Sequence, residues 1–186
     1  ICGSGIVDAI AGLLEKGVID ETGRLLGLDE YDGELTEDLE KRFIEIDSKN
    51  LFLLLKSENC ATDIDIAITQ KDVRELQNAK AAIAAGIRIL VQKAGIKMED
   101  IDKVYLAGGF GSYIDIDSAI RIGLLPKELR GRIESIGNAA GSGAAEGLLS
   151  VKMLKQAEEI KSRIEYIELS ACTEFMDEYV ECMMFE

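Results

Sequence analysis

Helical and strand periods alternate along the chain. Apolar residues at spacings of three and four predict helices over 4–16 and 70–94. Ser4 is the expected N-cap of the first helix. Thr69 and Asp72 have the spacing of a capping box, so the second helix is expected to begin there.

Strands are predicted wherever apolar residues alternate with polar ones or form a short run. The expected strands are 42–47, 51–57, 63–69, 103–107 and 165–170. Residues 48–50 are the expected hairpin turn between the first two. Residues 132–164 predict a strand, a turn of small residues and one long helix, and shorter helices are expected over 117–122 and 173–184. Strands that alternate with helices indicate an α/β layered fold.

Composition narrows the class of protein. The 186 residues are 47% hydrophobic and 30% charged, which is typical of one globular domain or of one lobe of a larger protein. The net charge of −14 argues against nucleic acids and anionic membranes as partners. No apolar run approaches the ~18–20 residues that a membrane span needs. The acidic segment 28–42 is expected to be an exposed excursion.

Metal and acid–base chemistry have few candidates within the chain. Histidine is absent, which removes the commonest general base and metal ligand. The four cysteines, Cys2, Cys60, Cys172 and Cys182, form no C-x-x-C pair, so a standard zinc or iron–sulfur spacing is excluded. We expect reduced thiols in a cytoplasmic protein, and we predict neither a catalytic residue nor a metal site in this chain.

A glycine-rich turn follows the expected strand 103–107. Gly108, Gly109 and Gly111 leave the backbone bare, so that a ligand could approach the main chain there. A tight structural turn explains the same residues equally well. The turn is not the dinucleotide fingerprint, because the last glycine of that motif would fall on Ile114.

Two further segments are rich in small residues. In 137–147, glycines and alanines recur at spacings of three and four, which favours a close helix crossing, a hinge or a phosphate at the helix start. In 2–5, the sequence CGSG stands at the mouth of the first helix and fits either an anion or ribose site or an ordinary capped helix start.

Four stretches together resemble a known family. They are ICGSGIVDAIAGLLEKGVID, ITQKDVRELQNAKAAIAAG, VYLAGGFGSYIDIDSAIRIGLLP and GNAAGSGAAEGLLS. Over residues 1–185 the chain resembles the C-terminal part of the ATP-dependent reductive activators of corrinoid proteins. These proteins carry a [2Fe–2S] ferredoxin-like domain before an actin-like ATPase domain of the acetate and sugar kinase/Hsp70/actin (ASKHA) superfamily. The resemblance implies that 1–186 is a single-domain fragment, the C-terminal lobe of that ATPase, with a ribonuclease H-like mixed sheet flanked by helices.

The resemblance also implies which residues contact ATP. Residues 106–112 match the adenosine motif of the superfamily, 3–5 match a helix start that faces the nucleotide cleft, and 137–147 match the second connecting motif near the hinge. The implied ATP-binding residues are Gly108, Gly109, Phe110, Gly111, Ser112, Gly3, Ser4 and Gly5. Lys71, Arg74 and Glu75, on the helix that covers adenine in relatives, are further candidates; a solvated first turn is the alternative for them.

Half of the implied machinery is not in this chain. The D-x-G-T-like phosphate motifs are missing, and Asp32-Gly33, the nearest match, lacks the threonine. The Mg ligands are therefore expected in an upstream lobe, and the [2Fe–2S] cluster in the parent protein but not here. Alone, the fragment is expected to be inactive and to bind ATP weakly.

The resemblance implies that the parent returns the cobalt of a corrinoid methyl-transfer protein from Co(II) to Co(I). Its expected partners are that corrinoid protein and the upstream lobe, and a homodimer with a second copy is left open. Three alternatives stay open: a lobe of a small-molecule kinase, a lobe of a radical-dehydratase activator, and an interaction module whose ATP site has decayed.

Overall fold

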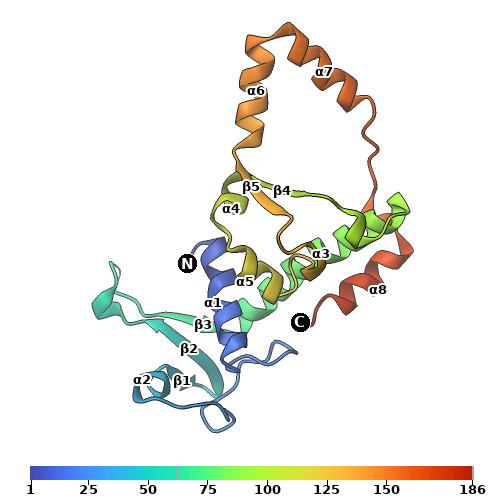
Figure 1. Cartoon of the computed structure of the whole chain (residues 1–186). Helices are drawn as coiled ribbons and strands as arrows, with labels where there is room; N and C mark the ends of the chain where they lie inside the picture. The colour runs from blue at the N-terminus through green and yellow to red at the C-terminus, as the bar shows by residue number, and fades with distance from the viewer. Residues whose placement is uncertain (62, 186) are drawn as a thin grey trace.

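The computed structural model describes residues 1–61 and 63–185, and these form helices around two small sheets (Figure 1). The main helices are α1 (Gly3–Glu15), α3 (Gln70–Ala94), α4 (Gly108–Tyr113), α5 (Ile116–Arg121), α6 (Ala139–Leu149), α7 (Val151–Lys161) and α8 (Thr173–Glu181), with a short α2 (Glu37–Glu40). The strands are β1 (Phe43–Ile46), β2 (Lys49–Leu55), β3 (Ile66–Thr69), β4 (Val104–Ala107) and β5 (Ile133–Gly137). The α/β prediction is confirmed.

The first sheet is antiparallel, in the order β1-β2-β3. Ile46 pairs with Lys49, so the hairpin turn is the two residues Asp47 and Ser48, with φ of 50° and 58°. Such a two-residue turn with positive φ matches the twist of the strands that it joins. The predicted turn 48–50 was therefore placed too far along the chain.

The second sheet consists of β4 and β5, which are parallel and in register from Val104 opposite Ile133. The chain between them runs through α4 and α5, as a parallel pair requires a crossover. Parallel strands are normally covered on both faces. Here Tyr105 on β4 is 56% exposed, and Ile136 on β5 is 42% exposed. One face of this sheet is thus largely open within the described residues.

The main core gathers around α1, whose Val7 and Ile10 are fully buried. Side chains from both sheets, α3 and the segment after α5 pack against it. The buried members of this cluster outside α1 are Val18, Ile19, Leu25, Phe52, Ile68, Val73, Ala119, Ile120, Ile122, Leu124, Leu125 and Phe185. Residues from both ends of the chain therefore share one core, which fixes the start of α1 in place.

The C-terminal segment is anchored to α3 by two buried polar residues. The Gln77 side-chain amide donates to the carbonyl of Thr22 at 3.0 Å and to that of Met183 at 2.8 Å. The Lys80 ammonium, 1% exposed, donates to the Met184 carbonyl and lies 5.4 Å from the centre of the Phe185 ring. These contacts satisfy polar groups that would otherwise destabilise the core.

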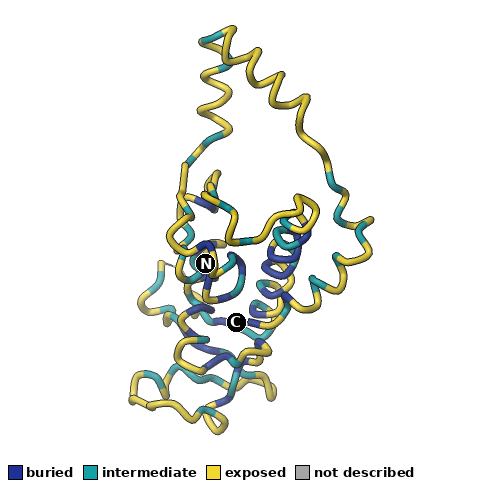
Figure 2. The backbone as a smooth tube through the Cα atoms, turned by 45° about the vertical axis from the view of Figure 1, so that its right-hand side comes forward, coloured by how far each residue is buried: buried dark blue, intermediate teal, exposed yellow. Residues whose placement is uncertain are grey.

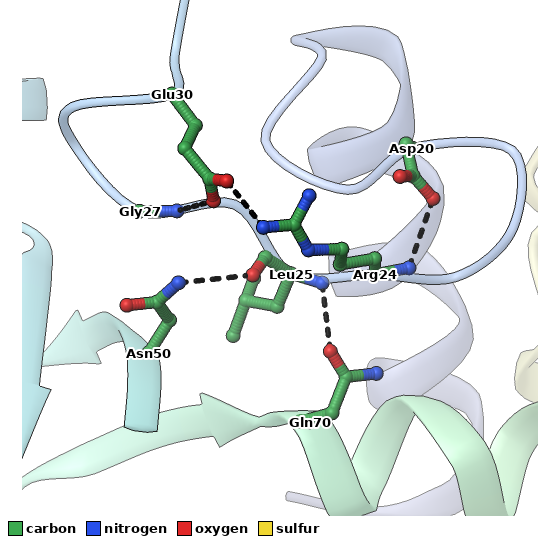
Figure 3. Close-up of polar contacts among 7 residues, drawn as sticks. All are labelled: Asp20, Arg24, Leu25, Gly27, Glu30, Asn50 and Gln70. Atoms are coloured by element: carbon green, nitrogen blue, oxygen red, sulfur yellow. Dashed lines mark hydrogen bonds and ion pairs between the residues drawn. The ribbon is translucent and has the colours of Figure 1, made fainter. Parts of the chain in front are cut away.

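A second set of polar contacts fixes the loop between α1 and β1 (Figure 3). The Asp20 carboxylate accepts from the Arg24 amide at 2.9 Å, and the Gln70 side chain accepts from the Leu25 amide at 2.8 Å. Asn50 donates to the Leu25 carbonyl at 3.3 Å. The loop thereby joins the starts of β2 and α3.

α6, α7 and the chain that follows leave the rest of the molecule and return only near α8 (Figures 1 and 2). We call residues 138–166 the arm and the other described residues the body. None of the arm's residues is buried, and Leu148 and Leu149 are each 88% exposed. The arm is long and mostly helical, but its apolar side chains have no core within the described chain.

Three local predictions are wrong. Ser4 is not an N-cap but lies in the first turn of α1, and Cys2 holds the cap position without a side-chain cap bond. Residues 165–170 form no strand. The predicted long helix is two, because Ser150 ends α6 and its hydroxyl accepts from the Met153 amide at 3.3 Å to begin α7.

Other predictions agree closely with the structure. Thr69 and Asp72 make the capping box at the start of α3, and Gly95 ends that helix with a φ of 67°. The segment 28–42 is mostly exposed, although it contains α2 and half-buries Tyr31 and Leu39 against the core.

Candidate functional site

The starts of α1 and α4 face a common open hollow of about 730 Å³. Its lining consists of residues 2–5, Asp8, Gly109, Phe110 and Tyr113, and we call it the glycine hollow. Its volume is within the range of pockets that hold small ligands, about 300–1,000 Å³. Two segments separated by more than a hundred residues, both singled out by the sequence, thus lie at one site.

The glycines after β4 have three different environments. Gly108 has a φ of 85°, which side chains rarely adopt, and it lets the strand turn sharply into α4. A Cβ on Gly111 would lie 3.1 Å from the Leu106 carbonyl carbon, so this glycine allows α4 to pack onto β4. A Cβ on Gly109 would meet no atom within 4 Å. Only Gly109 combines bare backbone with open space in the hollow.

The predicted glycine turn is therefore itself a short helix. Its Ser112 hydroxyl donates to the Gly108 carbonyl at 2.9 Å, one turn earlier. Ser112 does not line the hollow in this structure, whereas its neighbour Tyr113 does. α4 holds the bare backbone of these glycines in place. With six residues, it is too short to act as a strong dipole.

Backbone without a side chain also matters at the start of α1. A Cβ on Gly3 would lie 3.3 Å from the Cε2 atom of Phe110, tighter than an ordinary contact, so the Phe110 ring packs on that glycine. Ser4 is 9% exposed, and its Oγ atom lies 3.3 Å from the Cys2 sulfur. This hydrogen bond, followed by one from the Gly5 amide, lowers the pKa of the exposed Cys2 thiol.

The charged groups that line the hollow indicate which part of a nucleotide it could bind. Asp8 is its one ionisable carboxylate, and no lysine or arginine lines it among the described residues. A polyphosphate needs cations or a metal close by, whereas a nucleoside needs apolar surface and a few polar groups. The hollow thus suits the uncharged half of a nucleotide better than its phosphates.

Lys71, Arg74 and Glu75 lie outside the glycine hollow, exposed near the start of α3. Arg74 already has internal partners: its Nη1 atom donates to the Thr22 carbonyl at 3.0 Å and to the Gln77 Oε1 atom at 2.8 Å. That pair of bonds gives Arg74 a structural role, and the three residues stay predictions as nucleotide contacts.

Sequence reasoning did not select Asp8 and Tyr113 as site residues. Helical spacing carried the signal, since Asp8 is four residues after Ser4 on α1 and Tyr113 is three residues after Phe110 on α4. Side chains three or four apart share one helix face. Ser4 and Phe110 were already candidates, so Asp8 and Tyr113 could have been added as residues of the same helix faces.

Over residues 1–61 and 63–185, no group of three or more His, Cys, Asp or Glu side chains could hold a metal ion. The four cysteines are free. A second hollow, about 440 Å³, lies between residues 26–29 and the β1–β2 hairpin, and it contains none of the predicted site residues. In the part of the chain that the structure describes, no helix has the length and apolar character of a membrane span.

Comparison with known proteins finds activators and reductases of corrinoid proteins. Residues 1–186 match the family model described as the C-terminal domain of RACo, the ASKHA domain. The chain is 40% identical over 185 residues to the corrinoid activation enzyme RamQ of Eubacterium limosum, covering 99% of this chain and 31% of RamQ. It is 36% identical over 99 residues to the [Co(II) methylated amine-specific corrinoid protein] reductase of Methanosarcina barkeri, covering 53% of this chain and 18% of that protein.

A solved structure, a reductive activator for corrinoid, iron–sulfur protein, superposes with a TM-score of 0.86 at 37% identity. The match covers 100% of this chain and 28% of that one. The chain thus spans less than a third of the length of these relatives.

Proposed function

Because the chain belongs to the family of the C-terminal domain of RACo, the ASKHA domain, we propose that it is the adenosine-binding lobe of an ATP-dependent reductive activator of corrinoid proteins. The complete protein would return the cobalt of a corrinoid methyl-transfer protein from Co(II) to Co(I). The relatives support this assignment, since their names state corrinoid activation or reduction.

One observation carries the nucleotide assignment: Gly109 of α4 and residues 3–5 of α1 line the same hollow. The two segments come from separate parts of the chain, and both were expected to face ATP. A Cβ at Gly109 would fill space that no protein atom occupies, so the residue fits a close approach by a ligand.

In this proposal, Gly109 and Phe110 contact the adenosine, and residues 3–5 line the same hollow beside Phe110. Gly108 and Gly111 shape α4 and do not themselves need to touch the ligand. ATP would supply binding energy that differs between open and closed arrangements of two lobes, which can drive a change in a bound partner. The Mg ligands, the phosphate-binding loops and the [2Fe–2S] cluster belong to the remainder of the protein.

We further propose that residues 1–186 are one lobe and that the open face of β4–β5 and the arm meet the remainder of the protein. Exposed apolar surface of this extent is typical of an interface. The four free cysteines fit work in the cytoplasm, where thiols stay reduced. A homodimer stays a prediction.

The test is an ATP titration of the full-length protein by calorimetry, comparing wild type with Gly109→Val. The branched side chain would occupy the proposed nucleotide space, and we expect at least about a tenfold loss of affinity. The matched control is Gly12→Val, because Gly12 is also a helical glycine whose added Cβ meets nothing within 4 Å, but it lies outside the hollow.

The activity is tested by following Co(II) reduction in the corrinoid partner spectroscopically, with an excess of a low-potential reductant. We expect reduction to depend on ATP in wild type and Gly12→Val and to be lost in Gly109→Val. Equal ATP affinity in Gly109→Val and wild type would refute the adenosine assignment. Reduction that is independent of ATP would refute the proposed activity.

A further inference from the structure

We propose that the nucleobase is held mainly by stacking on the ring of Tyr113, so that the hollow binds nucleotides through the aromatic face of the base more than through base-specific hydrogen bonds. This inference rests on the proposed function and names the chemistry by which the same hollow recognises its ligand.

Two aromatic rings stand at the edge of the hollow. Phe110 and Tyr113 lie three residues apart on α4, and both line the hollow beside Gly109. Phe110 is 49% exposed and Tyr113 is 80% exposed. The chain is only 5% aromatic and has no tryptophan. An exposed pair of rings beside bare backbone therefore needs an explanation, and a planar ligand supplies one.

The two rings differ in their freedom to stack. Phe110 packs against Gly3 at the start of α1, which fixes one side of its ring. The ring pairs among the described residues are Tyr31–Phe43, Phe43–Phe52 and Phe175–Tyr179, and none of them includes Tyr113. Tyr113, 80% exposed and lining the hollow, thus has a ring face that no described aromatic ring covers.

The polar side chains of the hollow leave little for base-specific hydrogen bonding. Cys2 and Ser4 bond to each other. Asp8 is the remaining charged group, and a carboxylate only accepts hydrogen bonds. Adenine and guanine both carry an amino group that can donate to it, so Asp8 can serve as an acceptor for either base. Stacking tolerates any base, because every base has a π-face.

The experiment compares the full-length wild type with Tyr113→Ala, Tyr113→Phe and Tyr113→Leu in titrations with ATP, GTP and inorganic tripolyphosphate. Loss of the ring should weaken ATP and GTP binding alike by about 5- to 150-fold, the usual effect of removing a stacked aromatic ring. Phenylalanine should keep affinity within about twofold, because it keeps the π-face. Leucine should resemble alanine, because it is apolar but has no such face. Tripolyphosphate has no base, so its binding should be the same in all four proteins.

The matched control is Tyr166→Ala. Tyr166 is 81% exposed, almost the same as Tyr113, but it does not line the glycine hollow: it lies beside the end of α3, with its hydroxyl on Glu168 at 2.7 Å. We expect wild-type nucleotide affinity in this variant. Thermal melting of each variant shows that the protein is folded.

The outcomes separate the inference from the proposed function. If wild type binds no ATP, both fail. If wild type binds ATP and Tyr113→Ala or Tyr113→Leu binds it equally well, the stacking inference is overturned and the nucleotide site stands. An equal loss of ATP and tripolyphosphate binding in Tyr113→Ala would also overturn it, because the effect would then not involve the base.

Discussion

The body and the arm differ in how far their apolar side chains are buried. In the body, Val7, Ile10 and Ile122 are completely buried, and the cluster around α1 draws on residues from both ends of the chain. In the arm, Leu148 and Leu149 stand 88% exposed on the last turn of α6. α1 of the body and α6 of the arm are both regular helices, so secondary structure alone does not separate them, whereas burial does (Figure 2).

The difference shows which region is stabilised by contacts within the described chain. A buried aliphatic side chain stabilises a fold by about 1.5–3 kcal/mol relative to an exposed one, and the arm gains almost none of this from the described residues. The glycine hollow belongs to the body, so its geometry is fixed by this chain. The arm's apolar residues have no such burial among the described residues.

The largest expected effect comes from truncating one apolar residue in each region. In denaturant unfolding of residues 1–186, Ile10→Ala should cost about 2–5 kcal/mol of unfolding free energy, because it leaves a cavity in the core. Leu149→Ala should change it by less than about 0.5 kcal/mol, because that side chain is already in solvent.

A variant of the arm residue Leu149 extends the comparison to the complete protein. There, Leu149→Asp should lower the melting temperature if the arm packs against the upstream part, whereas in residues 1–186 it should not. A large effect of Leu149→Ala in the short chain would break the distinction between body and arm.

A smaller effect is expected from adding one methyl group to a glycine in each region. Gly111→Ala places a Cβ 3.1 Å from backbone and side-chain atoms of Leu106, and such overpacking costs about 1–3 kcal/mol. Gly143→Ala in α6 meets no atom within 4 Å and should stabilise residues 1–186 by up to about 1 kcal/mol, since alanine is the better helix former. Thermal melting measures both, and changes of the same sign would contradict the assignment of Gly111 to packing.

Local signals in the sequence were enough for elements whose ends are capped. The Thr69–Asp72 capping box and Gly95 predicted the limits of α3 correctly, because each acts within a few residues of itself. The prediction of a strand over 165–170 was wrong because a strand depends on residues distant in the sequence. Strands need a neighbour, and none of the described strands pairs with these residues.

The site divides in the same way. The sequence singled out Gly109 and residues 3–5 separately, but only the resemblance to a family implied that both face one ligand. Their meeting depends on how α1 and α4 pack around Phe110, which is a non-local contact. The helix crossing expected at 137–147 is not seen with any helix of the body among the described residues: the atoms nearest to a Cβ on Gly141 belong to its own cap, Asn138, and a Cβ on Gly147 would lie 3.8 Å from Leu154 of α7.

The smallest expected effect concerns the caps that begin helices in the two regions. Asp115 accepts from the Ser118 amide at 2.8 Å at the start of α5 in the body, and Asn138 accepts from the Gly141 amide at 3.0 Å at the start of α6 in the arm. The Ser118 amide, and then its hydroxyl, lowers the pKa of Asp115 from its ordinary value of 3.8.

A carboxyl group with a lowered pKa in the folded state contributes stability above its unfolded pKa, and it loses that contribution as the pH falls through the folded pKa. Acid below about pH 4 should therefore weaken the α5 cap while the amide of Asn138, which does not titrate, keeps α6 unchanged. We expect the hydrogen-exchange protection of the Ser118 amide to fall by about two- to fivefold, the effect of losing one exposed cap, while that of Gly141 stays constant. Asp115→Asn should remove the pH dependence and keep the cap. An equal loss of protection at both amides would show that acid acts on the whole fold, and the two helix starts would then not be independent.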